Sequence, residues 1–329
     1  MDSRDLMDLN AIVENIVVAS TDGSITVHGV SIGRRQDLGA PDSAQRVLAS
    51  MTSLLYLRSF AHLPIRWLYA SGAVEDDLTN NLRSANSQRP EIQPGWRVEA
   101  LLDGGALLAS RDGVRRVVGP GEYRSAESTG AALIGRDVVV TFPSELPAYQ
   151  AGFYIALRAQ DEDVSDQRQL LRFYWNVNES SATELVRLVT TTFAEARIPF
   201  RLKVANNTEL LSRRDAAVLY VSQRFFSAVT PIVRDIWRRL ETLLRPETPV
   251  CALRLRPGLA FAEDPGTNES FGQSRMALLS RAIVASLSDG SGTLADWPRH
   301  IATFREQQGE AGNRLYLTRS AVDIYSPAS

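Results

Sequence analysis

The chain has 329 residues, of which 44% are hydrophobic and 22% charged, a composition typical of a folded protein with one large domain or two ordinary ones. A formal net charge of -2 argues against a nucleic-acid partner. The single cysteine, Cys251, excludes an intrachain disulfide, and the three histidines, His28, His62 and His300, lack the spacing of zinc ligands.

The beginning of the chain carries no apolar run of the signal-peptide type. No stretch of 18 uninterrupted apolar residues occurs anywhere in the sequence. We therefore expect a cytoplasmic protein that has no membrane partner.

The first 150 residues are predicted to form two regions. Apolar residues recur at helical spacing over 43–60, which indicates a helical N-terminal lobe spanning 1–90. The polar segment 83–94 is interpreted as a connection. The β-like runs 96–102 and 105–110 flank Asp103-Gly104 as in a hairpin, which indicates a small β-hairpin region spanning 91–150.

From residue 151 onward, strand-like and helix-like patterns alternate. Strands are predicted over 153–157, 171–177, 200–204, 216–221 and 251–255, and helices over 183–197, over 229–244 and after Ser270. The fold class is therefore predicted to be α+β, and residues 151–329 are predicted to form a catalytic domain whose mixed sheet is flanked by helices.

Lys203 is the only lysine among 36 basic residues, and the other 35 are arginines. A guanidinium stays protonated at any working pH, whereas an amine can lose its proton and act as a base or nucleophile. Lys203 is therefore a candidate for chemistry, the alternative being that an arginine-rich composition left one lysine by chance.

Side chains alternate between the two faces of a strand, and three strands carry basic residues on one face. The sets that share a face are Arg172, Tyr174 and Asn176; Arg201 and Lys203; and Arg254 and Arg256. If these strands are neighbours, the guanidinium groups lower the pKa of Lys203, as partial burial does, and make it a general base. The alternative is that the arginines lie on a solvated outer face.

A second group of candidate residues follows the last predicted strand. Ser270 and Gln273 have the spacing of a capping box, so a helix is expected to begin there, and its free N–H groups together with Arg275 would bind an anion. Asp264 precedes this helix on a loop from which it could orient Lys203 or an arginine. An ordinary helix cap is the alternative.

The segment 212–215 offers one more candidate. Strand alternation lets Arg213, and not Arg214, share a face with Asp215, so Arg213 is the predicted site residue, and an ion pair at the start of a strand is the alternative. Kinase motifs fail here on order and spacing, and no Gly-x-Ser-x-Gly motif of a serine hydrolase occurs.

Five blocks of sequence, in order, resemble the HopA-type effector domain family. They are 172–176, 198–204, 213–220, 257–265 and 269–275, within a region of roughly 150–285. The family is named for a type III secreted effector of plant pathogens. Its bacterial relatives occur in gene clusters for class V lanthipeptides and thioamitides, where they are regarded as lyases that act after a separate kinase.

The resemblance implies a phosphoserine/phosphothreonine lyase that removes phosphate from a ribosomally made precursor peptide and leaves dehydroalanine or dehydrobutyrine. Its partners would be the phosphorylated precursor, a kinase-like protein and a cyclase. Lys203 would be the base, Asn176 or Tyr174 would face the substrate carbonyl, and Asp264 would orient the cluster. The residues expected to bind phosphate are Arg172, Arg201, Arg213, Ser270 and Arg275. No metal and no organic cofactor is implied.

Two rival functions use the same residues. A non-catalytic subunit that binds a phosphopeptide or a leader peptide needs the arginines, but it does not need Lys203 to lose a proton. An enzyme that forms a Schiff base also uses a lone lysine, although the surrounding guanidinium groups suit anion binding better than carbonyl condensation.

Overall fold

The structure is a computed structural model that describes residues 3–68, 78–126, 130–147, 149–159, 162–163, 165–166, 169–266, 269–288, 294–308, 310, 314–318 and 323–325. The predicted α+β class is confirmed, since helices accompany three antiparallel sheets in this part of the chain. None of the helices within these ranges is both long enough and apolar enough to cross a membrane.

A six-stranded sheet forms the centre of the molecule, with the strand order β13-β14-β10-β12-β11-β9. Its strands are β9 (Phe153–Arg158), β10 (Leu170–Trp175), β11 (Phe200–Ala205), β12 (Ala217–Ser222), β13 (Leu253–Arg256) and β14 (Leu259–Glu263). A mixed sheet was predicted from the alternation of strand-like and helix-like segments, and helix α4 (Glu179–Glu195) does connect β10 to β11. These two strands do run in the same direction, but β12 lies between them and pairs antiparallel with both, so every described pairing is antiparallel.

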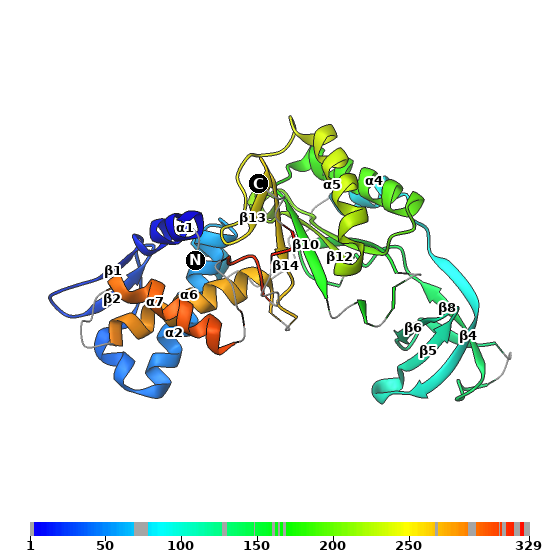
Figure 1. The fold of residues 1–329 in the computed structure, drawn as a ribbon, viewed down its shortest axis with the longest axis horizontal. Helices are drawn as coiled ribbons and strands as arrows, with labels where there is room; N and C mark the ends of the chain where they lie inside the picture. The colour runs from blue at the N-terminus through cyan, green and yellow to red at the C-terminus, as the bar shows by residue number, and fades with distance from the viewer. Residues whose placement is uncertain are drawn as a thin grey trace.

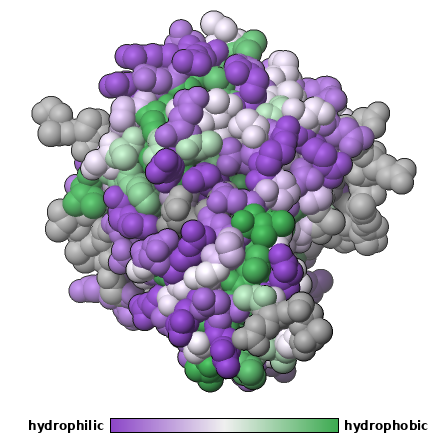
Figure 2. Space-filling model, turned by 90° about the vertical axis from the view of Figure 1, so that its right-hand side faces the viewer, coloured by the Kyte–Doolittle hydropathy of each residue, from purple (hydrophilic) through white to green (hydrophobic). Residues whose placement is uncertain are grey.

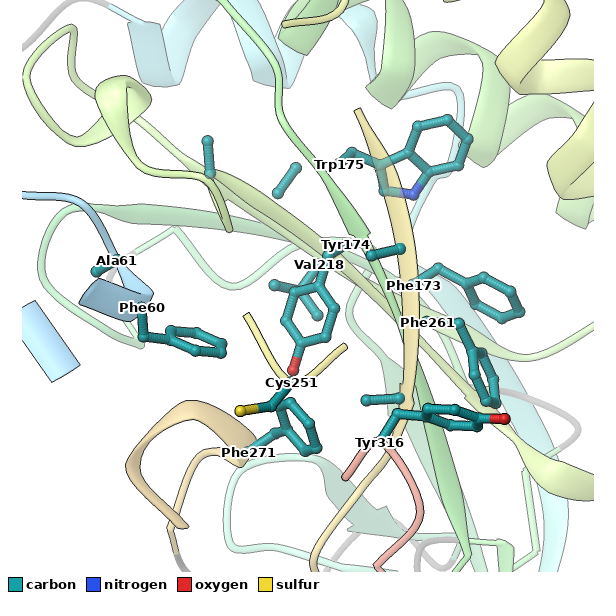
Figure 3. Packing of buried hydrophobic residues seen from close by; sticks show 14 of the residues in the cluster. Phe60, Ala61, Phe173, Tyr174, Trp175, Val218, Cys251, Phe261, Phe271 and Tyr316 are labelled. Atoms are coloured by element: carbon teal, nitrogen blue, oxygen red, sulfur yellow. The ribbon is translucent and has the colours of Figure 1, made fainter. Parts of the chain in front are cut away.

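The central sheet is covered on both faces (Figure 1). On one face α4 and α5 (Phe226–Leu240) contribute Phe193, which packs against Phe200, and Phe226, which packs against Phe261. On the other face Tyr174 lies between Phe60 and Phe271, with ring centroids 6.3 and 6.1 Å away (Figure 3). On this second face Arg172 and Tyr174 are buried, and Arg201 and Lys203 are half-buried.

The N-terminal lobe combines the first helices with the last ones. It contains α1 (Ser3–Val13), α2 (Pro41–Leu55), α6 (Phe271–Ser288), α7 (Trp297–Gln307) and a three-stranded sheet of β1 (Ile16–Val18), β2 (Ser24–Val27) and β3 (Val30–Arg34). Helix α3 (Leu78–Ala85) instead packs against α4. Helical periodicity did not indicate the three-stranded sheet. The helix predicted over 43–60 is α2 continued by a π-helical turn, Tyr56–Phe60, and α2 packs against α6 (Figure 1).

Residues 91–142 form a separate five-stranded sheet, ordered β6-β5-β4-β8-β7, around a small core that includes Trp96 and Phe142. Its strands are β4 (Glu91–Leu101), β5 (Leu107–Arg111), β6 (Val114–Val118), β7 (Tyr123–Ser125) and β8 (Asp137–Phe142). The hairpin predicted around Asp103-Gly104 is confirmed as the β4–β5 pair. The segment 83–94 is not only a connection, because it contains the end of α3 and the start of β4. Figure 2 views the molecule from the side of this sheet, where hydrophobic residues form separate patches among hydrophilic ones.

Candidate active site

Strand order brings the basic residues of β10 and β11 to one face of the sheet. Lys203 and Tyr174 both lie opposite Val218 of β12, and Arg201 and Arg172 both lie opposite Tyr220. Residues directly opposite one another in a sheet point to the same face. The sequence did not show whether β10 and β11 lie close together in one sheet. They do, with only β12 between them, so their basic residues lie on the same face.

Arg213 is buried beside β12 and holds Asp215. Its Nε and Nη2 donate to the two carboxylate oxygens of Asp215, each at 2.8 Å, and Nη2 also donates to the Tyr56 hydroxyl at 2.9 Å. Both members of the pair are 8% exposed. This two-pronged geometry fixes the guanidinium plane and still leaves Nη1 for another acceptor.

Arg172 makes the second buried ion pair of this face. Its Nε donates to Asp264 at 2.7 Å, its Nη2 lies 2.5 Å from the same carboxylate, and its guanidinium lies 5.2 Å from the Tyr220 ring centroid. Asp264 also accepts a hydrogen bond from the backbone of Gly266, so the loop after β14 holds the carboxylate in place. Asp264 thus orients Arg172, which was one of the two partners proposed for it.

The Lys203 amine lies against an aromatic ring and near both arginines. Its Nζ is 3.8 Å from the centroid of Phe153 on β9. Burial lowers the pKa of Lys203 to about 8; Arg213 and Arg172 also lower it, whereas Asp215 acts in the opposite direction. A substantial fraction of this amine is therefore unprotonated at mildly alkaline pH, which is unusual for lysine.

We call Lys203, Arg172, Arg213, Asp215 and Asp264 the Lys203 cluster. With the amine protonated, its three cations and two carboxylates carry a net charge of +1, and loss of the proton leaves the cluster neutral. Arg201, two residues before Lys203 on the same strand face, adds a further positive charge at its edge, and its buried Nε makes no hydrogen bond to a described residue.

A cavity of about 400 Å³ opens beside this cluster. The sheet contributes Phe153 to its wall, the loop before β12 contributes Arg213, and the N-terminal lobe contributes Tyr56 and Gln273. Because the Tyr56 hydroxyl already accepts from Arg213, its own proton remains available to a second partner. A ligand in this cavity would meet Arg213 and Tyr56 at one end of the buried cluster.

The helix start predicted at Ser270 is confirmed. The Ser270 hydroxyl accepts from the backbone N–H of Gln273 at 3.2 Å, and the Gln273 side chain accepts from the backbone N–H of Ser270 at 3.0 Å. This reciprocal capping box begins α6 at Phe271. The first turn of α6 therefore borders the cavity through Gln273.

Arg275 lies in a different environment from the one expected for it. The residue is 2% exposed, and its guanidinium donates to the Glu310 carboxylate at 2.8 and 3.3 Å and to the Leu317 carbonyl at 3.1 Å. Arg305 of α7 donates to the same Glu310 carboxylate at 3.2 Å. These contacts hold the C-terminal segment against α6, and Arg275 makes no hydrogen bond or ion pair with the Lys203 cluster in the part of the chain that the structure describes.

Tyr174 and Asn176 also lie away from the cavity, where they contact other parts of the fold. Tyr174 is buried between two phenylalanines, burial raises the pKa of its phenol, and its hydroxyl makes no hydrogen bond to a described residue. The Asn176 amide donates to the Glu247 carbonyl at 3.1 Å and accepts from Arg245 at 3.4 Å. Neither residue lines the 400 Å³ cavity.

The third predicted cationic face does not join the cluster. Arg254 and Arg256 lie on the edge strand β13, where both are exposed, so the solvated alternative describes them. A register shift in β13 places Arg254 opposite Ala260 and Arg256 opposite the adjacent Leu259, so the two arginines do not share a face as strand alternation predicted. The edge position of β13 also separates both of them from the two strands around β12.

Tyr56 and Phe153 were not predicted as site residues, and Asp215 was named only as the ion-pair partner of Arg213. Tyr56 comes from a helical segment about 150 positions before Lys203, so no local pattern connects the two. Among the described residues, no group of three or more histidine, cysteine, aspartate and glutamate side chains is arranged to hold a metal ion.

Comparison with known proteins identifies a family whose sequence model matches this chain. The sequence model of the HopA1 effector protein family matches residues 144–324. Two solved effector proteins of Pseudomonas syringae, from pathovars tomato and syringae, are similar to the chain at TM-scores of 0.44, with 13% and 14% identity; each alignment covers 87% of this chain and 95% or 96% of the other. No curated protein matches the chain.

Proposed function

Because the chain belongs to the HopA1 effector protein family, we propose that it is a lyase that eliminates phosphate from phosphoserine or phosphothreonine in a ribosomally made precursor peptide. The products would be dehydroalanine or dehydrobutyrine and inorganic phosphate. The observation that carries the proposal is Lys203, the only lysine in the chain, whose pKa is lowered to about 8 next to two buried arginines and a cavity.

Elimination starts with removal of the proton on Cα of the phosphorylated residue. The neutral amine of Lys203 takes this proton and becomes an ammonium group. The electron pair of the Cα–H bond forms the Cα=Cβ double bond, the Cβ–O bond breaks, and its electrons leave with the phosphate. Phosphate is a stable anion, so the step needs no general acid.

The departing phosphate requires cations that do not have to move. Arg213 and Arg172 are suited to this, because Asp215 and Asp264 hold their guanidinium planes while Nη1 of each remains for an anion. The first turn of α6, capped by Ser270, would add backbone N–H groups on the same side of the cavity. Arg201 would contribute charge at longer range.

The carbonyl next to Cα gains negative charge when the proton leaves, so a hydrogen-bond donor there speeds the reaction. Tyr56 supports this role better than Tyr174 or Asn176, because it lines the cavity and has a free hydroxyl proton. The cytoplasmic setting, a separate kinase-like protein that phosphorylates the precursor, and a cyclase that uses the product remain parts of this proposal.

The test is mass spectrometry of a synthetic peptide with one phosphothreonine, incubated with the purified protein. We expect a product lighter by one phosphoric acid and bearing dehydrobutyrine, while the unphosphorylated peptide is unchanged. Binding of the phosphopeptide without any loss of phosphate would favour the non-catalytic binding subunit, and dehydration of the unphosphorylated peptide would contradict the mechanism.

A further inference from the structure

The cavity beside Arg213 continues into a larger one along α2. The second cavity has a volume of about 810 Å³. Both cavities are lined by Thr52 and Ser53 of α2, and on the opposite wall the adjacent α6 residues Gln273 and Ser274 each line one of them. The two hollows therefore adjoin at Thr52 and Ser53, and we call them together the α2 groove.

The α2 groove has the length and shape of a channel for extended chain. Along α2 it runs from Gln45 to Tyr56, about 16 Å of helix, which matches about five residues of extended peptide. Small side chains, Ala49 and Ser53 on α2 and Ala277 on α6, leave room above the helix backbones.

Its lining suits a peptide backbone. Gln45 and Ser274 offer an amide and a hydroxyl that can donate and accept hydrogen bonds. The hydroxyls of Thr52 and Thr318 donate their protons to the Leu48 and Asp264 carbonyls, and their oxygens can accept from a ligand. An extended peptide carries one N–H donor and one C=O acceptor at nearly every residue, and these must find partners when the peptide is bound. An apolar ligand would leave the groups of the groove unsatisfied.

The outer wall of the groove is tied to the Lys203 cluster. Thr318 lines the groove, and its hydroxyl donates to the Asp264 carbonyl at 3.0 Å, while Asp264 holds Arg172. Glu310 lines the same wall and is held by Arg275 and Arg305. The Arg275 contacts therefore shape a wall of the groove instead of contributing a cation to the phosphate site.

We propose that the α2 groove binds the residues that flank the phosphorylated residue of a peptide substrate, so that α2, which lies outside the family-matched segment 144–324, determines substrate choice. This inference rests on the proposed function for the identity of the bound peptide. It adds that affinity depends on residues several positions away from the one that reacts.

The test compares two synthetic probes, each with a central phosphothreonine: a tripeptide, and a nonapeptide library with randomised flanks. Dissociation constants are measured by fluorescence anisotropy, and phosphate release is measured with the same peptides. We expect the wild-type protein to bind the library at least about tenfold more tightly than the tripeptide. Ala49→Trp, at an exposed position that lines only the larger cavity, should reduce this ratio to about one.

Ser50→Trp is the matched control, since Ser50 is the next residue of α2, is also exposed, and does not line the groove. It should keep the wild-type ratio. Ser53→Trp, on the wall shared by both cavities, provides a second blocking variant if Ala49→Trp lowers the melting temperature.

The outcomes separate the two proposals. Phosphate release without a length advantage, or with one that both blocking variants keep, would overturn the groove and leave the lyase intact. A length advantage that the blocking variants remove, with no phosphate release by the wild-type protein, would support the groove and overturn the lyase.

Discussion

The molecule contains two buried sets of arginines and carboxylates, and they differ in whether their arginines line a cavity. In the Lys203 cluster, Arg213 lines a cavity and its Nη1 remains for an anion. In the second set, which we call the Arg275 cluster (Arg275, Arg305 and Glu310), the guanidinium groups point to a carboxylate and to the carbonyls of Arg314 and Leu317. Neither Arg275 nor Arg305 lines either of the two cavities, so we expect ligand binding at Arg213 and not at the Arg275 cluster.

The two clusters also differ because one of them contains an amine, that of Lys203. Only the Lys203 cluster contains a group that loses its proton near neutral pH. Burial also lowers the pKa of Arg305 in the Arg275 cluster, but a guanidinium remains protonated throughout the working range of a protein. We therefore expect chemistry in one cluster and structural support in the other.

The largest expected effect is that of Lys203→Arg, which keeps the charge and removes the base. It should lower the single-turnover rate of phosphate elimination by roughly 10²–10⁴ while the phosphopeptide dissociation constant changes little. Rapid quenching with mass spectrometry measures the rate. A variant that eliminates phosphate at near wild-type rate would remove Lys203 from the role of base, even if the protein is a lyase.

Arg275→Gln tests the other cluster through stability. The change leaves Glu310 with one cation fewer in a buried site, so the free energy of unfolding should fall by about 3–5 kcal/mol. Urea denaturation measures it. Below the melting transition, the rate with the phosphothreonine tripeptide should stay within threefold of wild type; a loss as large as that of Lys203→Arg would instead return Arg275 to the phosphate site.

Arg213→Gln should affect transition-state binding. Loss of a charge-assisted donor at the cavity should lower kcat/KM by roughly 30- to 1,000-fold, equivalent to about 2–4 kcal/mol. The control is Arg256→Gln, on the exposed edge strand β13, which should leave kcat/KM unchanged. Equal values for the two variants would indicate that Arg213 serves only to hold Asp215.

The pH dependence of kcat/KM should follow the free Lys203 amine. Because the unprotonated form acts as the base, kcat/KM should rise about tenfold per pH unit below pH 8 and level off above it. A profile that is flat between pH 6 and 9 would contradict the assignment.

The smallest expected effect is that of Lys203→Met, which should raise the free energy of unfolding. The folded state holds the amine at a pKa of about 8 against an ordinary value of 10.5, so the unfolded state binds more protons between these values, and the wild-type protein gains stability as pH rises through that window. At pH 7 the full penalty is present, and Lys203→Met should be more stable by on the order of 2–3 kcal/mol. The advantage should shrink towards pH 10, as thermal melting at several pH values would show.

Local patterns in the sequence determined much of this molecule. Strand alternation correctly assigned Arg172 and Tyr174 to one face and Arg201 with Lys203 to one face, because a side-chain period of two is a property of the strand itself. The capping box at Ser270 was equally local, since its two partners lie three residues apart.

Tertiary structure decided which of these faces meet. The insertion of β12 between β10 and β11 joins Arg172 to Lys203, while the edge position of β13 leaves Arg254 exposed, and no periodicity encodes strand order. The same holds for Arg275, whose partner Glu310 lies 35 positions away, and for Tyr56, which reaches Arg213 across 157 positions. Sequence determines what a face carries, because that depends on neighbours in the chain; the cavity and its donors depend on packing between distant segments.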